Sequence, residues 1–421
     1  MIQNEVEAVT QELQQVKESL RKLVDLEPGM VNRIIDEVPD LTAQRRGEIL
    51  TENQKDLDRM DPNDPKYDRL MLTESRLIGI EQDLRAVAKL PSPLGITLES
   101  KSVPSGLQLT KITVPLGVIA VVYESRPNVT FDVFSLCFKA GNATVLKGSR
   151  DAHFSNQIII KIIREVLHRY GLAACVYLAP SERSATPLIL NAVGLIDVII
   201  PRGSSGLINF VRENSQVPVI ETGAGIVHTY YDQTADLIKG QAIIENAKTR
   251  RVSVCNALDT LLIHRNRKED LVKIFAGLDK KHQLTIYADP EAFAVLRNHY
   301  DPLLLVPAVA ESFGTEFLSM KLSVKVVDSL AEALDHIDQY SSKHSEAIIA
   351  ESQDTIERFM RSVDAATVYA NASTAYTDGG EFGLGAEIGI STQKTHARGP
   401  MGLREITSYK WLVRGDGHVR P

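Results

Sequence analysis

Cysteine is scarce in this sequence, and the patterns missing around it exclude several classes of protein. The 421 residues include three cysteines, Cys137, Cys175 and Cys255, and such an odd, sparse set does not form a disulfide framework. The sequence also lacks a Cys-x-x-Cys pair and a His-Glu-x-x-His helix, so it offers no recognisable metal site. We therefore expect reduced cysteines and no bound metal.

Long apolar runs and an excess of basic residues are absent as well. No stretch approaches the roughly 18 apolar residues of a membrane-spanning helix, and the acidic start of the chain does not resemble a signal or transit peptide. The formal net charge of −7 argues against a general nucleic-acid-binding protein. These absences favour a cytoplasmic protein that binds neither membranes nor nucleic acid, although local basic clusters can still bind a small anion.

The residues that are present have an average globular composition. Hydrophobic residues make up 43% of the chain and charged residues 24%, which is enough for a large packed core. The length predicts two or three domains. Apolar residues at spacings of three and four predict an N-terminal helix that stops near Pro28, and further helices over 41–59 and 66–89. The first helix forms a short coiled coil or packs on its own domain, and its early stop favours the second.

From about residue 110, short apolar, β-branched runs alternate with helical patterns. This alternation predicts βαβ units with mostly parallel sheets, whose ligands bind at the carboxyl ends of the strands. A second alternating series begins near residue 236, so we expect two α/β domains. The predicted strands are 117–123, 143–146, 175–178, 196–200, 217–220, 258–264, 303–306 and 324–327, with helices over 156–170, 207–213, 267–277 and 329–341, and a C-terminal strand or arm over 405–413.

Cys255 differs from the other two cysteines in its sequence surroundings. The other two lie in apolar patterns, where a free cysteine usually acts as a small buried hydrophobic residue. Cys255 precedes a predicted strand and follows Lys248, Arg250 and Arg251. Nearby cations stabilise a thiolate, which is the nucleophilic form of cysteine. The residues alone leave a nucleophile and an inert cysteine equally open.

A turn rich in glycine and serine follows the strand predicted at 196–200. Gly203, Ser204 and Gly206 open the next helix, where free backbone N–H groups can bind a phosphate. A tight strand-to-helix turn without a ligand explains the same residues. Lys147 follows an earlier strand and could reach a cofactor ribose or its 2′-phosphate, or be a solvated loop charge.

Two other polar groups follow predicted strands. Ser125, Arg126 and Asn128 offer a hydroxyl, a guanidinium and an amide, which suit a phosphate or a developing oxyanion, although a polar loop with a capping residue is the alternative. Glu221 precedes two glycines that let a ligand approach the backbone. A third group, Lys394, His396 and Arg398, occupies alternate positions, so these side chains could share one face of an extended segment.

Together these pieces resemble the aldehyde dehydrogenase superfamily and, within it, the γ-glutamyl phosphate reductase family. Glu221 lies 34 positions before Cys255, similar to the glutamate-to-cysteine spacing of the superfamily, and the pair at 316–317 is similar to its later Glu-Phe pair. The finer resemblance lies in long motifs that follow one another between about residues 40 and 415. They are residues 122–130, 200–203, 246–249, 376–380, 382–387 and 391–403.

The resemblance implies an α/β fold of the aldehyde dehydrogenase type, with mostly parallel sheets in two domains and an oligomerisation arm. Residues 1–223 would form the N-terminal helices and the NADP-binding domain, and residues 224–380 the catalytic domain. Residues 98–112 and 385–421 would form the arm and the C-terminal return. A homodimer or tetramer is expected of this architecture, and a transient contact with glutamate 5-kinase is a further expectation.

The implied activity is the NADPH-dependent reduction of L-glutamate 5-phosphate to L-glutamate 5-semialdehyde in proline biosynthesis, through a thioester on Cys255. Lys147 and the turn 203–206 would bind the adenosine phosphates of NADPH, and Glu316 its nicotinamide ribose. Asn128 and the Cys255 backbone N–H would bind the oxyanion. The substrate phosphate would be bound by Ser125, Arg126 and Asn128, or by Lys394, His396 and Arg398.

Two other functions stay open beside this one. In hydrolytic aldehyde dehydrogenases the carboxylate that matches Glu221 activates water, whereas a reductase must protect its thioester from hydrolysis. A non-catalytic scaffold would retain the fold alone, and the intact Cys255 and glycine turns oppose it. The sequence departs from the family's usual pattern at Val227, Val252 and Val254, which changes packing near the site and leaves the cysteine in place.

Overall fold

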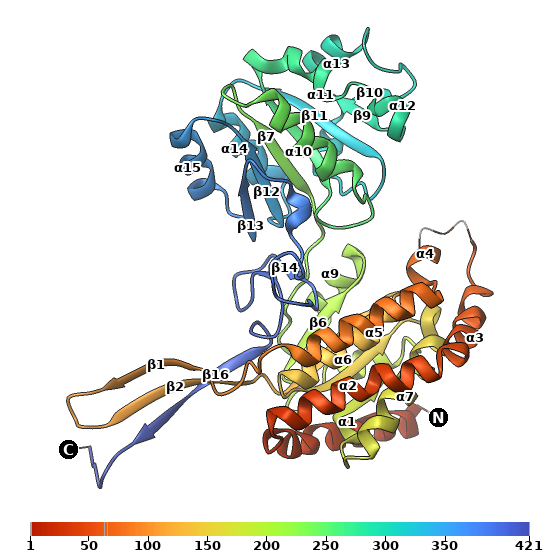
Figure 1. Ribbon diagram of the computed structural model, residues 1–421, viewed down its shortest axis with the longest axis vertical. Coiled ribbons are helices and arrows are strands. Elements are labelled where there is room, and N and C mark those ends of the chain that lie inside the picture. The colour runs from red at the N-terminus through yellow and green to blue at the C-terminus, as the bar shows by residue number, and fades with distance from the viewer. Residues whose placement is uncertain (1, 63, 65, 421) are drawn as a thin grey trace.

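The computed structural model describes residues 2–62, 64 and 66–420 of the chain. Within them the chain forms two α/β lobes and a narrow antiparallel arm that extends away from both (Figure 1). The expectation of mostly parallel sheets is confirmed. The outermost residues of the expected segments, Met1 and Pro421, lie outside the described residues.

The first lobe begins with a layer of helices. In the first of them Val9, Leu13, Val16 and Leu23 are buried in the core of the lobe, so the helix packs on its own domain rather than in a coiled coil. Thr73 caps the N-terminus of the last of these helices, which starts at Glu74. Its hydroxyl accepts a hydrogen bond from the Arg76 N–H at 3.2 Å. These helices are α1 (Ile2–Val24), α2 (Pro28–Gln44), α3 (Arg46–Leu57), α4 (Tyr67–Leu70) and α5 (Glu74–Lys89).

A four-stranded parallel sheet in the order β5-β4-β3-β6 follows. Every residue of β3 and β4 is buried, as expected of a parallel sheet covered on both faces. The strands are β3 (Val118–Tyr123), β4 (Ala143–Gly148), β5 (Val176–Leu178) and β6 (Val198–Arg202). The helices between and after them are α6 (Asn128–Lys139), η1 (Arg150–Ala152), α7 (His153–His168), η2 (Ala173–Cys175), α8 (Ala185–Leu190) and α9 (Ser205–Asn214).

The strand predicted at 217–220 is wrong. Of these residues, Val219 alone forms an isolated bridge, to Ile199 of β6. Pro218 has no backbone N–H to donate, which explains why the ladder does not continue. The segment therefore ends the sheet as an irregular edge and leads directly to Glu221.

The second lobe is built on a seven-stranded parallel sheet in the order β10-β9-β11-β8-β7-β12-β13. Its strands are β7 (Val227–Tyr231), β8 (Leu258–His264), β9 (Thr285–Ala288), β10 (Leu305–Pro307), β11 (Lys321–Val327), β12 (Ser345–Ile349) and β13 (Thr367–Ala370). Its helices are α10 (Leu237–Thr249), η3 (Arg265–Asp270), α11 (Leu271–Ile274), α12 (Leu278–His282), α13 (Pro290–Leu296), η4 (Ala310–Gly314), α14 (Leu330–Tyr340), α15 (Gln353–Ser362) and η5 (Thr374–Tyr376).

The arm joins residues far apart in the sequence. In this antiparallel sheet β2 (Gln108–Pro115) pairs with β1 (Thr97–Ser102) and with β16 (Thr407–Arg414). Tyr409, Trp411 and Val413 expose apolar side chains on β16. Before the chain returns to the arm it forms the small pair β14 (Ile390–Ser391) and β15 (Gly399–Pro400), and β14 lies between the two lobes (Figure 1).

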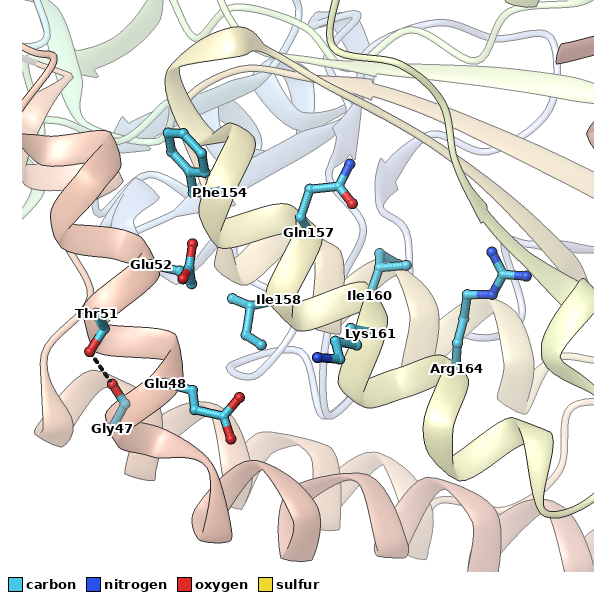
Figure 2. A pocket seen from close by; sticks show the side chains of 10 residues that line it. All are labelled: Gly47, Glu48, Thr51, Glu52, Phe154, Gln157, Ile158, Ile160, Lys161 and Arg164. Atoms are coloured by element: carbon cyan, nitrogen blue, oxygen red, sulfur yellow. Dashed lines mark hydrogen bonds between the residues drawn. The ribbon is translucent and has the colours of Figure 1, made fainter. Parts of the chain in front are cut away.

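An open groove lies on the helical side of the first lobe, between α3 and α7 (Figure 2). Glu48 and Glu52 of α3 face Lys161 of α7 across it, with Phe154 at one end. None of the site residues proposed from the sequence lines this groove. It is therefore separate from the chemistry described next.

Candidate active site

The carboxyl ends of β3, β4 and β6 meet at one edge of the four-stranded sheet, because the strands are parallel neighbours. Arg126 follows β3, and Arg202 is the last residue of β6. Both guanidinium groups act electrostatically on the Cys255 thiol, which lies in the turn between α10 and β8. This edge therefore brings two cations to the candidate nucleophile.

The turn that carries Cys255 contacts two other segments, at Gly225 and at Thr377. Residue 225 has to be glycine, because a Cβ there would lie 1.6 Å from the Cys255 carbonyl oxygen. The Gly225 N–H donates to a carboxylate oxygen of Glu316 at 2.8 Å. On the other side, the Asn256 amide donates to the Thr377 carbonyl at 2.9 Å. The cysteine thus lies at a junction of the second lobe with the irregular C-terminal segment.

Burial and nearby charges have opposing effects on the Cys255 thiol. Burial raises its pKa to about 11, and the negative charge of Glu387 acts in the same direction. Arg202 and Arg126 lower the pKa but do not offset burial.

The basic residues next to Cys255 in the sequence are not the cations that act on it. Lys248 is buried, and its ammonium lies 3.6 Å from the Asp259 carboxylate. Arg250 and Arg251 are exposed. Proximity along the chain is therefore a poor guide to the charges around the thiol.

Arg126 is held as an available cation. Burial and the neighbouring Arg202 and Arg69 lower its pKa to about 10, so the guanidinium stays charged at neutral pH. No hydrogen bond or ion pair joins it to another residue in the described part of the chain. A half-buried guanidinium with five donors suits a phosphate oxygen.

Ser125 shapes the turn that presents Arg126. It adopts a left-handed backbone with φ of 39°, which is uncommon for a residue with a side chain. Its hydroxyl donates to Asp151 at 2.7 Å, and its N–H donates to the Ser149 hydroxyl at 3.2 Å. The Ser125 side chain is therefore engaged by the loop after β4.

Asn128 is the first residue of α6, and its amide donates to Asp132 at 3.0 Å. This bond uses one of its two amide hydrogens. The positive charge of Arg202 in turn lowers the pKa of Asp132. Asn128 thus lies in the same electrostatic neighbourhood as the cysteine and keeps one donor for a ligand.

The residues expected to bind a cofactor lie at the same sheet edge. Lys147 is buried at the end of β4 and donates to the Gly148 and Ser181 carbonyls at 3.3 and 3.2 Å. Burial lowers its pKa to about 8, which leaves it mainly charged at neutral pH. It can therefore still attract an anionic group.

The turn at the start of α9 already holds an anionic group. The Ser204 N–H and hydroxyl donate to the two oxygens of Glu124 at 2.9 and 3.3 Å. A Cβ on Gly203 would lie 2.7 Å from that carboxylate. The turn therefore fits a phosphate chemically, and a cofactor phosphate would take the place of the Glu124 carboxylate.

The structure does not bring the remaining sequence candidates to the thiol. The Glu221 carboxylate lies 3.6 Å from Arg212, and its charge is not among the largest influences on the pKa of Cys255. Lys394 and Arg398 each lie 2.8 Å from the Asp364 carboxylate. His396 contacts the Glu405 carbonyl at 2.7 Å through its ring nitrogen.

Comparison with known proteins identifies the family. The chain is 58% identical to the γ-glutamyl phosphate reductase of Chlorobaculum parvum over 418 residues, which cover 99% of each chain. It is 56% identical to that of Bacteroides fragilis over 401 residues, 95% of this chain and 96% of the relative. The chain belongs to the γ-glutamyl phosphate reductase family. No family model matches it.

Solved structures agree with this membership of the γ-glutamyl phosphate reductase family. The crystal structure of γ-glutamyl phosphate reductase from Thermotoga maritima superimposes with a TM-score of 0.92 at 37% identity, and covers 98% of this chain and 99% of that one. An acetylating aldehyde dehydrogenase from Geobacillus thermoglucosidasius gives a TM-score of 0.70 at 17% identity, over 100% and 99% of the chains. The second likeness shows the aldehyde dehydrogenase-like fold alone.

Two residues of this γ-glutamyl phosphate reductase family member act on Cys255 but were not selected from the sequence. Arg202 ends the strand before the glycine turn, and Glu387 ends the motif at 382–387. Both lie in motifs that carried the family resemblance, so a signal was present. The glycines of the motif after β6 were proposed as site residues, whereas the charged residues Arg202 and Glu387 were not.

The described residues of this γ-glutamyl phosphate reductase family member contain neither a cluster of metal-binding side chains nor a helix suited to a membrane. Among residues 2–62, 64 and 66–420, no group of three or more His, Cys, Asp or Glu side chains is arranged to hold a metal ion. No helix in the same ranges is long and apolar enough to cross a membrane.

Proposed function

We propose that the chain reduces γ-glutamyl phosphate to glutamate 5-semialdehyde, with release of phosphate, as a step of proline biosynthesis. The observation that carries the proposal is the charged, unpaired Arg126, whose charge lowers the pKa of a cysteine packed closely against Gly225. The near full-length relatives that bear the name γ-glutamyl phosphate reductase support the same substrate.

Cys255 acts as the nucleophile. Its sulfur attacks the acyl carbon, the bond from that carbon to the phosphate oxygen breaks, and a thioester forms on the cysteine. Arg126 and Arg202 offset the charge of the departing phosphate, since both already act on the thiol. The Cys255 backbone N–H and the free amide hydrogen of Asn128 bind the oxyanion that forms at the acyl oxygen.

NADPH is the proposed cofactor, and when bound it supplies the hydride that reduces the thioester. Lys147 and the Ser204 turn bind its adenosine phosphates, and Lys147 distinguishes the 2′-phosphate of NADPH from the hydroxyl of NADH. Glu316, which accepts the Gly225 N–H at 2.8 Å, would hold the nicotinamide ribose. The buried charge of Lys147 supports this assignment.

The arrangement of Glu221 favours a reductase over a hydrolytic dehydrogenase. A general base has to contact the water that it activates, but the Glu221 carboxylate pairs with the Arg212 guanidinium at 3.6 Å. We infer that it orders the site. The three free cysteines suit the reducing cytoplasm, and the exposed apolar residues of the arm suit a homodimer or tetramer.

The decisive experiment runs the reaction backwards. The purified protein is given glutamate 5-semialdehyde and NADP⁺, with and without inorganic phosphate, and formation of NADPH is followed by absorbance. The proposal expects oxidation that requires phosphate, accepts arsenate in its place and prefers NADP⁺ to NAD⁺. Brisk oxidation without phosphate would support the hydrolytic dehydrogenase instead.

A further inference from the structure

A short helix of the N-terminal layer reaches the turn that carries Cys255. This helix, α4, lies at the end of the layer nearest the second lobe (Figure 1). The Arg69 guanidinium on α4 donates to the Ser253 carbonyl at 3.4 Å, two residues before the candidate nucleophile. The helical layer of the first lobe therefore brings to this turn a cation that does not come from a strand end.

The main chain around Arg69 is fixed by contacts of its own. The Asn53 side-chain N–H donates to the Leu70 carbonyl at 2.9 Å, and the Asn53 side-chain oxygen accepts the Leu72 N–H at 2.8 Å. Leu70 is fully buried in a small apolar cluster that includes Ala152. The fold thus sets the position of Arg69, and the hydrogen bond to the cysteine turn adds to it.

The loop after β4 connects this helix to the turn of Arg126. Ala152, which packs in the cluster of Leu70, follows Asp151 in that loop. Asp151 accepts the hydroxyl of Ser125, the residue before Arg126, at 2.7 Å. The residues next to both arginines therefore contact the same loop. Burial, a second arginine and the charge of Arg69 lower the pKa of Arg126, so the two guanidinium groups are near enough to repel each other.

Arg69 carries a charge without an anionic partner. Within residues 2–62, 64 and 66–420 no carboxylate pairs with it, and the neighbouring Asp68 pairs with Arg76 at 2.7 Å instead. The bond to the Ser253 carbonyl uses one of the five N–H donors of the guanidinium. Two unpaired arginines that repel each other suit a ligand with two anionic groups.

We propose that Arg69 binds the α-carboxylate of the glutamyl substrate and so makes the site specific for the glutamyl group. The inference rests on the proposed function, in which Arg126 binds the phosphate. γ-Glutamyl phosphate carries its phosphate and its α-carboxylate at opposite ends of a five-carbon chain, so each anionic end has its own arginine. A planar guanidinium can form two parallel hydrogen bonds with a carboxylate, which would fix the chain relative to Cys255.

The test separates the Michaelis constant for the semialdehyde from that for phosphate. Wild-type protein and Arg69→Ala are compared in oxidation of glutamate 5-semialdehyde by NADP⁺, with one substrate varied while the others are held in excess. We expect the Michaelis constant for the semialdehyde to rise about 10–100-fold, the range for a lost charged hydrogen-bonding partner. The Michaelis constant for phosphate and the maximal turnover should stay within about threefold, because Arg69 would contact neither the phosphate nor the reacting carbon.

Two further variants make the result specific. Arg69→Lys, which keeps a charge but not the planar fork of donors, should give an intermediate Michaelis constant for the semialdehyde. Lys66→Ala removes an exposed charge three positions earlier and should leave all the constants unchanged. Melting temperatures close to that of the wild-type protein show that each variant is folded.

A Michaelis constant for the semialdehyde within threefold of wild type in folded Arg69→Ala would overturn the inference. A larger rise in the Michaelis constant for phosphate would overturn it as well, and so would a fall in maximal turnover alone. Failure of the proposed function is distinguishable from these results, because the wild-type protein would then oxidise the semialdehyde without phosphate.

Discussion

Two regions surround Cys255, and they are built in different ways. One is the strand-end region, the carboxyl ends of β3, β4 and β6 with residues 123–126, 147–150 and 202–206. The other is the C-terminal segment, residues 377–398, which contains little regular structure beyond the two residues of β14. The first region presents its charged groups along one sheet edge. The second sends neighbouring residues to separate places.

The difference follows from what fixes each residue. In a parallel sheet the hydrogen-bond register brings strand ends together, so residues far apart in sequence meet at a common edge. In the C-terminal segment individual contacts decide the outcome. Glu387 acts on Cys255, Lys394 pairs with Asp364, and His396 contacts the Glu405 carbonyl.

The largest effect is expected when the sulfur of Cys255, which both regions surround, is replaced by oxygen. Cys255→Ser should lower turnover on the order of 10⁴-fold with the fold intact, because an alcohol is a poor nucleophile at neutral pH. Cys137→Ser and Cys175→Ser should instead lower the free energy of unfolding by about 1–3 kcal/mol, because both thiols are buried. Steady-state rates and urea unfolding check both. Substantial turnover by folded Cys255→Ser would show that Cys255 is not the nucleophile.

The next effect tests the strand-end region. Arg126→Ala should weaken phosphate-dependent oxidation about 10²-fold, roughly 3 kcal/mol, because a charged hydrogen-bonding partner of phosphate is lost. The loss should appear mainly as a raised Michaelis constant for phosphate. Arg183→Ala, at an exposed position of the same lobe, is the matched control and should change nothing. Unchanged phosphate dependence in Arg126→Ala would show that the phosphate binds elsewhere.

The regular elements were largely predictable from the sequence. The buried runs that became β3, β4 and β8 are short, apolar and β-branched, and such runs have few alternatives to a parallel sheet. The prediction at 217–220 failed because Pro218, inside the apolar run, has no backbone N–H to continue the ladder. The arm was predicted through family resemblance, since its pairing of β2 with β16 joins residues about 300 positions apart.

The candidate site was predictable where it depends on strand ends and not where it depends on single contacts. Arg126 was proposed from its place after a strand, and it lies beside Cys255. Lys248 was expected near the thiol because it is close to Cys255 in the sequence, but its ammonium is buried beside the Asp259 carboxylate. Nothing in the local sequence distinguishes these outcomes, because each depends on a partner from another strand or loop.

A smaller effect concerns cofactor choice at the strand ends. Lys147→Ala should raise the Michaelis constant for NADPH about tenfold, roughly 1.4 kcal/mol, and leave that for NADH nearly unchanged. The reason is that Lys147 carries the only charge that we assign to the 2′-phosphate. Initial rates with both cofactors measure the difference. Equal effects on both would mean that Lys147 reads the shared part of the cofactor.

Glu221 lies between the two regions in the sequence. Its substitution tests whether it acts as a general base. Glu221→Gln should leave reductive turnover within about tenfold of wild type, because its carboxylate pairs with Arg212. In a hydrolytic enzyme the same change would cost about 10²–10⁴-fold. The assay is phosphate-dependent oxidation, with Glu213→Gln on the exposed end of α9 as control.

The smallest effect on activity is expected from the ion pairs of the C-terminal segment. Lys394, with Arg398 and Lys343, holds the pKa of Asp364 well below its usual range. Such a carboxylate stabilises the fold above its unfolded pKa of about 4, and this contribution is lost as the pH falls from about 4 towards 2. Asp364→Asn should therefore melt at a lower temperature than wild type at pH 7, and the gap should narrow at pH 3.

The same variant decides whether the C-terminal segment serves the substrate phosphate. Because the Asp364 cluster is partly exposed, the stability change should be small, and turnover of Asp364→Asn should stay within about threefold of wild type. Lys394→Ala should behave alike, since it removes the other half of the pair. If Lys394→Ala instead raised the Michaelis constant for phosphate as much as Arg126→Ala, the lysine would leave Asp364 when substrate binds. The two regions would then act on one anion, and the contrast between them would hold only for the resting protein.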